Sequence, residues 1–145
     1  MNIINEFRMT VDSKSINEGF SRAAVAAFAA QLDPTLDEIS DIKMAVSEAV
    51  TNCIVHAYPD CVGKIYIYAA VTENNLFKVS VRDKGCGIID VKQAMEPLFT
   101  TLGGERAGLG FAVMESFTDK ISVRSAVGKG TTVTMYKRIN GRGAV

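Results

Sequence analysis

The sequence predicts an α+β fold, a two-layer α/β sandwich in which a mostly antiparallel sheet is covered by helices on one face. Two observations favour it: long segments with helical spacing of apolar residues come early, and the strand-like runs follow one another in hairpins instead of alternating with helices. The 145 residues are 48% hydrophobic, which suits a single core in a domain of about 100–150 residues. We expect one domain over 1–145, with a frayed tail from about residue 139.

The first half of the chain predicts one strand and two helices. Apolar and polar residues alternate over Phe7–Val11, as in a half-buried strand. A capping-box pattern at Ser15 and Glu18 begins a helix that ends near Gln31, and a second one at Thr35 and Glu38 begins a longer helix from Leu36 to about Ala57. We expect the core-facing side of the first helix to carry the apolar residues Ile16, Phe20, Ala24, Ala27 and Phe28.

The second half predicts hairpins around a long glycine-rich loop. Two strand-like runs flank the turn 73–75, and a short helical candidate follows them at Asp90–Met95. A short helix from about Leu109 to Phe117 precedes the last two strands. Because long irregular loops often carry function, we expect the site in this loop. The four predicted strands of this half are Lys64–Val71, Leu76–Asp83, Ile121–Ser125 and Thr131–Tyr136.

Composition excludes several classes of function. Sixteen Lys and Arg balance sixteen Asp and Glu, so we expect no direct nucleic-acid or membrane partner. The longest apolar run, Ala23–Ala30, is far shorter than the ~20 residues of a membrane helix, and the opening MNIINEF does not resemble a secretion signal. Three cysteines and one histidine make neither a disulfide framework nor a zinc site. We expect a soluble, cytoplasmic protein.

A row of polar residues lies on the second predicted helix. Glu48, Asn52 and His56 are spaced four apart, so they stack along one side of the helix at the border of its apolar face, where they are expected to be half-buried. A carboxylate, an amide and an imidazole in such a row can activate a nucleophile and ligate a hard cation through oxygen. A solvated helix face with weak contacts between neighbouring turns is the alternative interpretation.

A second motif, Asp83-Lys84-Gly85-Cys86-Gly87, comes directly after a predicted strand. Glycines let a backbone approach a ligand, and a carboxylate at a strand end can accept a hydrogen bond from an exocyclic amine. Such a site would select adenine over guanine, because a carboxylate cannot accept a hydrogen bond from a carbonyl. A plain turn is the alternative. The pattern fits neither a Rossmann fingerprint nor a Walker loop.

Two further motifs follow. Gly108, Leu109 and Gly110 begin a predicted helix, where exposed N–H groups and the positive end of the helix dipole suit a phosphate. Arg106 precedes them and either reaches a terminal phosphate or is a solvated loop charge. Thr131 follows the turn pattern GKG, which is most simply a hairpin turn, with a ligand role for the threonine as the alternative.

Taken in order, these motifs resemble the ATP site of the GHKL superfamily, which includes histidine kinases, gyrase-like ATPases and anti-sigma factor kinases. The resemblance covers nearly the whole chain, which is similar to the bacterial anti-sigma factors with serine kinase activity. Three stretches are most similar to the anti-sigma F factors of endospore formers: VAAFAAQLDPT, VSEAVTNCIVHAY and EPLFTTLGGERAGLGFAVMESF.

The resemblance implies a GHKL (Bergerat-like) fold with an ATP lid, and it implies ATP or ADP and Mg²⁺ as cofactors. Glu48 would be the general base, Asn52 the Mg²⁺ ligand and Asp83 the adenine anchor, while Arg106 would act in catalysis beneath a lid at Leu98–Ala107. The nucleotide would also contact Gly85, Gly87, Gly108, Leu109, Gly110 and Thr131.

The sequence departs from the family pattern at Ala57, where the family often has glycine, and Cys86 occupies a variable position. Neither departure affects the nucleotide motifs. We do not expect a sensor histidine kinase, because such a kinase needs a phosphoacceptor histidine on a separate dimerisation helix and the only histidine, His56, lies inside the polar row. A gyrase-type ATPase would need a second, transducing domain, for which 145 residues leave no room.

The resemblance also implies partners. The protein would sequester a sporulation sigma factor, an RNA polymerase subunit, and phosphorylate a serine of an anti-anti-sigma antagonist, with ATP or ADP selecting the partner. It would form a homodimer, and the face of the first helix that carries Arg22 would meet partners, although a solvated arginine is an equal alternative. Two other functions stay open: a stress-response anti-sigma serine kinase, and a non-catalytic nucleotide-dependent sigma-binding module. Glu48 discriminates, since nucleotide binding alone needs no base.

Overall fold

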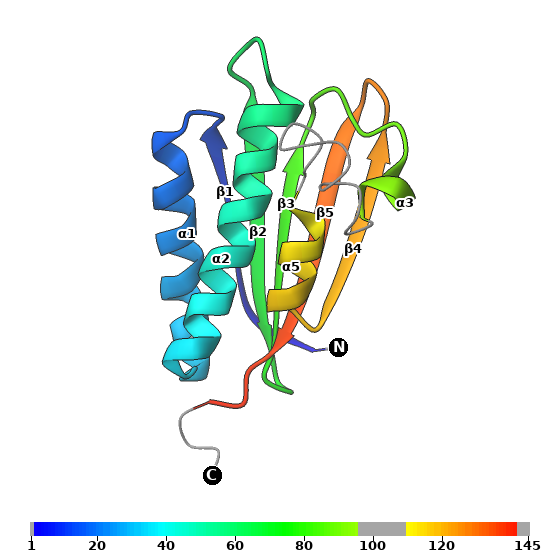
Figure 1. The fold of residues 1–145 in the computed structure, drawn as a ribbon. Coiled ribbons are helices and arrows are strands. Elements are labelled where there is room, and N and C mark those ends of the chain that lie inside the picture. The colour runs from blue at the N-terminus through cyan, green and yellow to red at the C-terminus, as the bar shows by residue number, and fades with distance from the viewer. Residues whose placement is uncertain (1, 96–109, 142–145) are drawn as a thin grey trace.

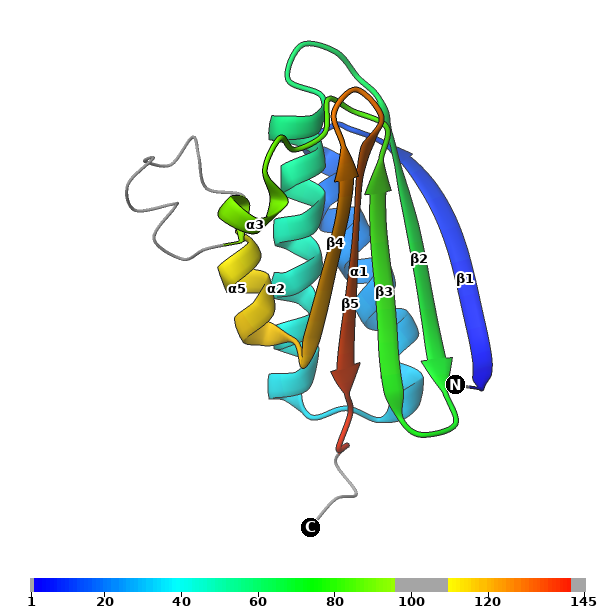
Figure 2. The ribbon, with the colours of Figure 1, turned by 90° about the vertical axis from the view of Figure 1, so that its right-hand side faces the viewer.

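The computed structural model describes residues 2–95 and 110–141, which form two layers (Figure 1). Figure 2 shows the helices on one side of the sheet, and no described helix lies on its other side. This confirms the predicted α+β sandwich. The strands are β1 (Ile3–Asp12), β2 (Lys64–Thr72), β3 (Leu76–Asp83), β4 (Lys120–Ala126) and β5 (Gly130–Arg138). The helices are α1 (Ile16–Ala29), α2 (Leu36–Asn52), α3 (Val91–Ala94) and α5 (Phe111–Phe117), with a 3-10 turn η1 (Ala30–Leu32) after α1 and a π turn η2 (Cys53–Ala57) after α2.

The sheet has the strand order β1-β2-β3-β5-β4, and all neighbouring strands are antiparallel. The predicted hairpin of β2 and β3 is confirmed, with Asn75 at φ +59° in its turn. Strand β1 is longer than predicted and begins at Ile3 instead of Phe7. Its first four residues are all exposed. A strand segment with neither face buried needs no alternation of polar and apolar residues, so only its pairing with β2 identifies it as strand.

The core lies between the sheet and the helices. Successive strand residues point to opposite faces, so every second side chain of β2, β3 and β5 is buried against α1, α2 and α5. No helix among the described residues combines the length and apolar character needed to span a bilayer. The largest fully buried side chains include Phe77, Phe111, Ile65, Ile67, Met114 and Met135.

The apolar face predicted for the first helix is largely wrong. Ile16 and Phe20 are 80% and 57% exposed, and Ala27 is also exposed. Alanines occupy both sides of this helix, so apolar character alone does not single out the buried side. Of the predicted set, Ala24 and Phe28 are half-buried. The residues that face the core are Ser21, Val25, Ala26 and Ala29.

The two capping boxes differ in outcome. The box at Thr35 and Glu38 is confirmed: the Glu38 N–H donates to Thr35 Oγ1 at 3.1 Å, and the Thr35 N–H donates to Glu38 Oε1 at 2.9 Å. The box at Ser15 is wrong, because Ser15 is helical and its side chain makes no capping bond. The Glu18 carboxylate instead accepts the Ser47 hydroxyl of α2 at 2.6 Å.

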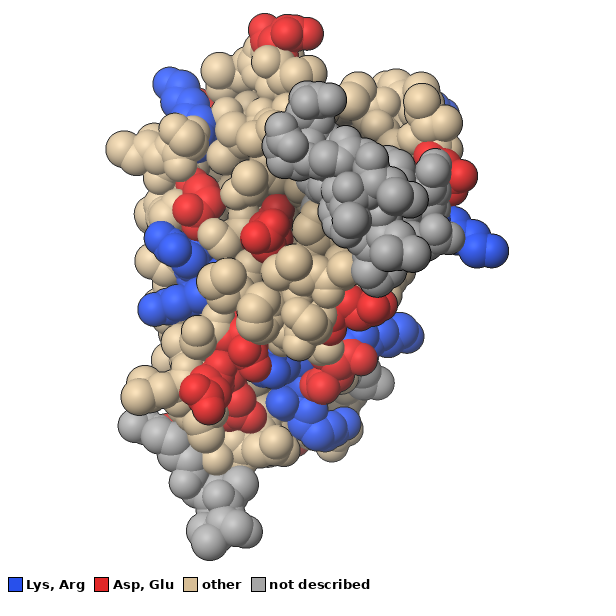
Figure 3. All heavy atoms as spheres, in the orientation of Figure 1, with Lys and Arg blue, Asp and Glu red and all other residues tan. Residues whose placement is uncertain are grey.

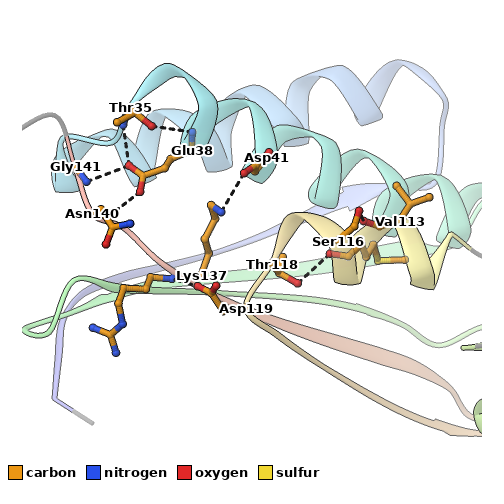
Figure 4. Close-up of polar contacts among 12 residues, drawn as sticks. Thr35, Glu38, Asp41, Val113, Ser116, Thr118, Asp119, Lys137, Asn140 and Gly141 are labelled. Atoms are coloured by element: carbon orange, nitrogen blue, oxygen red, sulfur yellow. Dashed lines mark hydrogen bonds and ion pairs between the residues drawn. The ribbon is translucent and has the colours of Figure 1, made fainter. Parts of the chain in front are cut away.

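The C-terminal segment is held against α2. Ile139 is 2% exposed, since it continues the alternation of β5 onto the core face. The N–H groups of Asn140 and Gly141 donate to Glu38 at 2.7 and 3.1 Å (Figure 4). The expectation of a frayed tail is therefore wrong for 139–141, while 142–145 lie outside the described residues.

Candidate active site

The polar row of the sequence begins near the C-terminal end of α2. Glu48 and Asn52 lie on this helix and His56 lies in the π turn η2, and all three are half-buried, as their spacing predicts. Hydrogen bonds of a π turn span five residues instead of four, which rotates His56 relative to the α-helical row. Its carbonyl oxygen accepts the Cys86 thiol at 3.2 Å. The α-helical row therefore consists of Glu48 and Asn52.

The Glu48 carboxylate lies against the start of α5. Gly110 precedes this helix with φ +69°, and a Cβ built on it would lie 2.4 Å from Oε2 of Glu48. A larger residue would displace the carboxylate and strain the backbone. The fold thus brings together two predicted site residues that are far apart in the sequence, and it explains why one of them is glycine.

Asp83 ends β3 with its side chain on the buried face, where it is 6% exposed. Its Oδ1 accepts N–H bonds from Gly85 at 2.9 Å and from Thr131 at 3.2 Å. Its Oδ2 accepts the thiol of Cys53 at 3.6 Å. Burial, and then the Asp83 charge, raise the pKa of the Cys53 thiol, so the sulfur keeps its proton and can donate it. The carboxylate is therefore held in one orientation by three segments.

Gly85 and Gly87 let the loop after β3 touch two neighbouring segments. A Cβ on Gly85 would lie 2.3 Å from the carbonyl oxygen of Ala57. A Cβ on Gly87, whose φ is +79°, would lie 2.3 Å from the carbonyl oxygen of Ala126. Packing alone therefore requires both glycines, and their predicted contact with a nucleotide stays a prediction.

Thr131 belongs to a hydrogen-bonded cluster at the turn between β4 and β5. Its Oγ1 lies 2.7 Å from Ser125 Oγ, which also accepts the Ile88 N–H at 2.8 Å. Together with the bond from Thr131 to Asp83, this cluster links the turn to the end of β3. The Thr131 hydroxyl thus has a protein partner.

Sequence reasoning missed three side chains that support this site: Cys53, Tyr58 and Ser125. The Tyr58 hydroxyl accepts the Lys84 N–H and donates to the Lys64 carbonyl, both at 2.7 Å. Burial raises the pKa of Tyr58, which keeps this hydroxyl protonated. Each of the three contacts a residue distant in sequence, so a single sequence carries no local signal for them.

Asn52 is the predicted Mg²⁺ ligand. Within residues 2–95 and 110–141, no group of three or more His, Cys, Asp or Glu side chains is gathered to hold a metal ion. A nucleotide-bound Mg²⁺ needs no such group, because phosphates and water supply most of its oxygens and the protein only one or two. One half-buried amide oxygen, a turn away from Glu48, fits that donor set.

Arg22 lies on α1 away from these residues. Its Nε is 3.4 Å from Glu18, on the side of α1 where Glu18 also accepts the Ser47 hydroxyl of α2. The Arg22 side chain is 43% exposed, so it is accessible from solvent. The remaining predicted site residues lie outside the described part of the chain: Arg106, Gly108, Leu109 and the lid Leu98–Ala107.

Comparisons with known proteins identify the family of the chain. Residues 16–137 match the family model described as a histidine kinase-like ATPase domain. The anti-sigma F factor of Caldanaerobacter subterraneus subsp. tengcongensis is 59% identical over 128 residues, which are 88% of this chain and 89% of that protein. The anti-sigma F factor of Thermoanaerobacter sp. (strain X514) is 54% identical over 140 residues, which are 96% and 97% of the two chains.

Solved structures share the fold. The structure of the RsbU and RsbW domains of Rv1364c from Mycobacterium tuberculosis gives a TM-score of 0.70 at 23% identity, over 93% of this chain and 32% of that one. The histidine kinase domain of the blue-light activated kinase from Erythrobacter litoralis EL346 gives 0.59 at 20% identity, over 85% and 61%. The family model and the relatives agree over nearly the whole chain. The chain therefore belongs to the anti-sigma F factor family of histidine kinase-like ATPase domains.

Proposed function

We propose that this protein is an ATP-dependent protein serine kinase that also sequesters a sigma factor. The observation that carries the kinase proposal is the position of Glu48, whose half-buried carboxylate lies against Gly110 at the start of α5. The C-terminal end of α2 and the Asp83 end of β3 are at the same end of the molecule (Figure 1). One end of the fold therefore carries both the proposed base and the proposed adenine anchor.

In the proposed reaction, the hydroxyl oxygen of a substrate serine attacks the γ-phosphorus of ATP. The bond between that phosphorus and the oxygen bridging to the β-phosphate breaks, and ADP leaves with the bridging oxygen. Glu48 accepts the serine proton as general base. Mg²⁺ held by Asn52 would neutralise phosphate charge, and Arg106 would pair with the terminal phosphate.

Asp83 is proposed to accept a hydrogen bond from the exocyclic amine of adenine. Its carboxylate is fixed by Cys53, Gly85 and Thr131, so its orientation is set before the nucleotide arrives, which lowers the entropic cost of binding. Because its oxygens are fixed by these protein groups, Asp83 selects a base by the position of the amine donor as well as by its own charge. The other proposed nucleotide contacts are Gly85, Gly87, Gly108, Leu109, Gly110 and Thr131.

The names of the relatives, anti-sigma F factors, support a sigma factor as one partner. We propose a sporulation sigma factor, an anti-anti-sigma antagonist as the serine substrate, and ATP or ADP as the selector between them, all in the cytoplasm. The accessible face around Arg22 is the proposed partner contact. A homodimer is proposed through β1, which forms one edge of the sheet.

The decisive experiment is single-turnover phosphotransfer from γ-labelled ATP to the antagonist, followed by phosphoamino-acid analysis. Glu48→Gln should lower the rate by ~10²–10⁴-fold, the usual contribution of a general base. ATP affinity should change little, because Glu48 is proposed to face the γ-phosphate and not the adenine. Glu115→Gln is the matched control, since Glu115 is an exposed glutamate on α5 and should leave the rate unchanged.

The outcomes separate the alternatives. Phosphoserine formed by the wild type and lost in Glu48→Gln supports the kinase. A Glu48→Gln variant that transfers phosphate at the wild-type rate would mean that another group is the base. A wild-type protein that binds ATP and a sigma factor but transfers no phosphate would be a non-catalytic binding module. Transfer only to a stress-response antagonist would assign the other class of anti-sigma kinase.

A further inference from the structure

The face of the sheet opposite the helices carries a high density of positive charge. Residues that alternate with the buried positions of each strand point to this face. Its carboxylates are Glu6 and Asp12. Its cations are Arg8, Lys64, Lys78, Arg82, Lys84, Lys120, Arg124 and Arg138. The neutral net charge of the chain thus conceals an excess of positive charge on this face.

Both carboxylates of this face are already paired. Glu6 accepts hydrogen bonds from the Tyr68 hydroxyl and, at 3.4 Å, from Arg8. Asp12 pairs with Lys64 at 2.5 Å. Lys78 also lies close enough to Glu6 to help lower the pKa of that carboxyl. Within the described part of the chain, the other cations of this face form no ion pair with an acidic side chain. Figure 3 shows that on the helix-covered face, by contrast, acidic and basic side chains are interspersed.

Three tyrosines of this face have cations over their rings. Tyr68 has the charged groups of Arg8 and Lys78 over its ring at 4.6 and 5.6 Å. Tyr66 has the charged groups of Arg82 and Lys84 over its ring at 5.5 and 5.0 Å. Tyr136 has those of Lys78 and Lys120 at 5.8 and 5.7 Å. Such contacts stabilise a cation by electrostatic attraction to the face of the ring. The face is therefore a layer of cations on aromatic rings.

We propose that this open sheet face is a docking surface for an acidic polypeptide, one that presents Asp and Glu side chains. Charge complementarity sets the sign of the partner. Tyrosine and arginine, which this face combines, are the residues most enriched at the energetic centres of protein interfaces.

The same observations disfavour the two other occupants. A single-stranded nucleic acid gains its affinity by stacking bases on exposed aromatic rings, whereas cations cover the rings of Tyr66 and Tyr136 here. A second copy that docked face to face would set this positive surface against itself, which is repulsive. A carboxylate-bearing polypeptide satisfies the unpaired cations without either cost.

Two cations make the sharpest test. Arg82 on β3 and Arg124 on β4 both oppose Thr132 of the intervening strand, so their backbones are about 10 Å apart. Both side chains are exposed, and reversing their charge removes no buried contact. The matched control reverses two exposed lysines of the helix side, Lys43 on α2 and Lys92 on α3.

The experiment titrates poly-L-glutamate, and oligothymidylate of the same total charge, into the full-length protein by calorimetry. Arg82→Glu with Arg124→Glu should weaken poly-L-glutamate binding at least about tenfold, and Lys43→Glu with Lys92→Glu by less than about twofold. Raising the salt concentration should weaken wild-type binding more than binding by the sheet-face variant. Arg82→Gln with Arg124→Gln gives a milder second variant that should lose part of the affinity.

Several results would overturn the proposal. One is equal loss of poly-L-glutamate affinity in the sheet-face and helix-side variants, or no binding by the wild type. Another is tighter binding of oligothymidylate than of poly-L-glutamate, which would assign the face to nucleic acid. A third is sedimentation of the sheet-face variants as a smaller species than the wild type, which would make the face an interface between copies of this chain.

Discussion

Two glutamates of α2 differ in their surroundings. Near the N-terminal end of the helix, Glu38 is 9% exposed and accepts N–H bonds from Thr35, Asn140 and Gly141. Nearer the other end, Glu48 is half-buried beside Gly110, which has no side chain. Figure 4 shows the Glu38 carboxylate bonded both to Thr35 at the start of the helix and to Asn140 and Gly141 after β5. The second carboxylate is approached by a glycine, whose missing side chain leaves its position undisturbed. The same residue type on the same helix thus serves the fold at one end and is proposed to serve chemistry at the other.

This contrast has a thermodynamic consequence. Hydrogen bonds to a buried charged group stabilise a protein by about 1.5–3 kcal/mol, so changes around Glu38 should alter stability and leave nucleotide chemistry unchanged. Changes at Glu48, which is half-buried and proposed to face the γ-phosphate, should alter nucleotide chemistry more than stability. Asp83 belongs to both sides, because it is buried and hydrogen-bonded and is also the proposed adenine anchor.

The largest effect is expected from Gly110→Ala. The new Cβ would lie 2.4 Å from Glu48 Oε2, and a displacement of about 1 Å at a catalytic group can cost 10²-fold in rate. Single-turnover phosphotransfer should therefore fall at least ~10²-fold. Gly128→Ala is the control, because Gly128 has a similar φ of +78° and open space around its Cα. It carries the backbone strain without the collision and should keep the wild-type rate; equal rates for the two variants would refute the proposed contact.

The next effect is expected from Asp83→Asn. The amide oxygen can still accept the N–H bonds of Gly85 and Thr131, so the fold should persist, while the charge-assisted bond to adenine is lost. ATP affinity should fall roughly 10- to 150-fold, which corresponds to ~1.5–3 kcal/mol. Asp119→Asn is the control, since Asp119 accepts the Arg138 N–H at 2.6 Å from the other end of the molecule. Unchanged ATP affinity of Asp83→Asn in calorimetry would remove the adenine assignment.

Local patterns in the sequence predicted the secondary structure and the polar row. The box at Thr35 and Glu38 follows from residue types three positions apart, and the burial of Glu48 and Asn52 follows from helical spacing. The identical pattern at Ser15 fails: the backbone of Ser15 is helical and its hydroxyl makes no capping bond, while the Glu18 carboxylate accepts Ser47 of another helix. A tertiary contact therefore overrides a local signal.

Contacts between distant segments could not be predicted. Gly85 is required by Ala57, Gly110 is close to Glu48, and Cys53 donates to Asp83, and each pair is joined only after the sheet and helices have packed. The sequence motifs indicated that Gly85 and Gly110 were needed. The structure shows that Ala57 and Glu48 are the neighbours that leave no space for a side chain at these two positions. The buried Ile139 was missed for the same reason, because only its place in the sheet distinguishes it from a tail.

At the other end of α2, Glu38→Gln should reduce stability by about 1–3 kcal/mol without changing ATP affinity. Glutamine replaces one of the two carboxylate oxygens with an NH₂ group. Since Asn140 donates to Oε2 whereas Gly141 and Thr35 donate to Oε1, at least one N–H loses its acceptor. Urea unfolding measures the loss, and an ATP titration on the same variant provides the comparison. A variant of wild-type stability would show that Glu38 contributes nothing to holding the chain end.

The same carboxylate makes stability depend on pH. Burial raises the pKa of Glu38, but N–H bonds from Thr35, Asn140 and Gly141 lower it more, so it lies below the ordinary value of 4.5. A pKa lowered by folding adds stability that is complete above the unfolded pKa and is lost as the pH falls through the folded value. The stability difference between wild type and Glu38→Gln should therefore be constant near neutral pH and shrink below about 4.5. A difference that grows on acidification would contradict this sign.

The smallest effect is expected from two substitutions at the capping-box positions Thr35 and Ser15. Comparing them tests whether the sequence pattern or the hydrogen bond seen in the structure determines the contribution to stability. Thr35→Ala removes the Oγ1 that accepts the Glu38 N–H at 3.1 Å and should cost about 1 kcal/mol. Ser15→Ala removes a hydroxyl that makes no capping bond and should change the free energy of unfolding by less than about 0.5 kcal/mol. Because both residues precede a glutamate by three positions, the pattern alone predicts equal losses, whereas the structure predicts a loss only for Thr35→Ala. Urea midpoints of the two variants measured side by side decide between them, and equal losses would mean that Ser15 caps α1 after all.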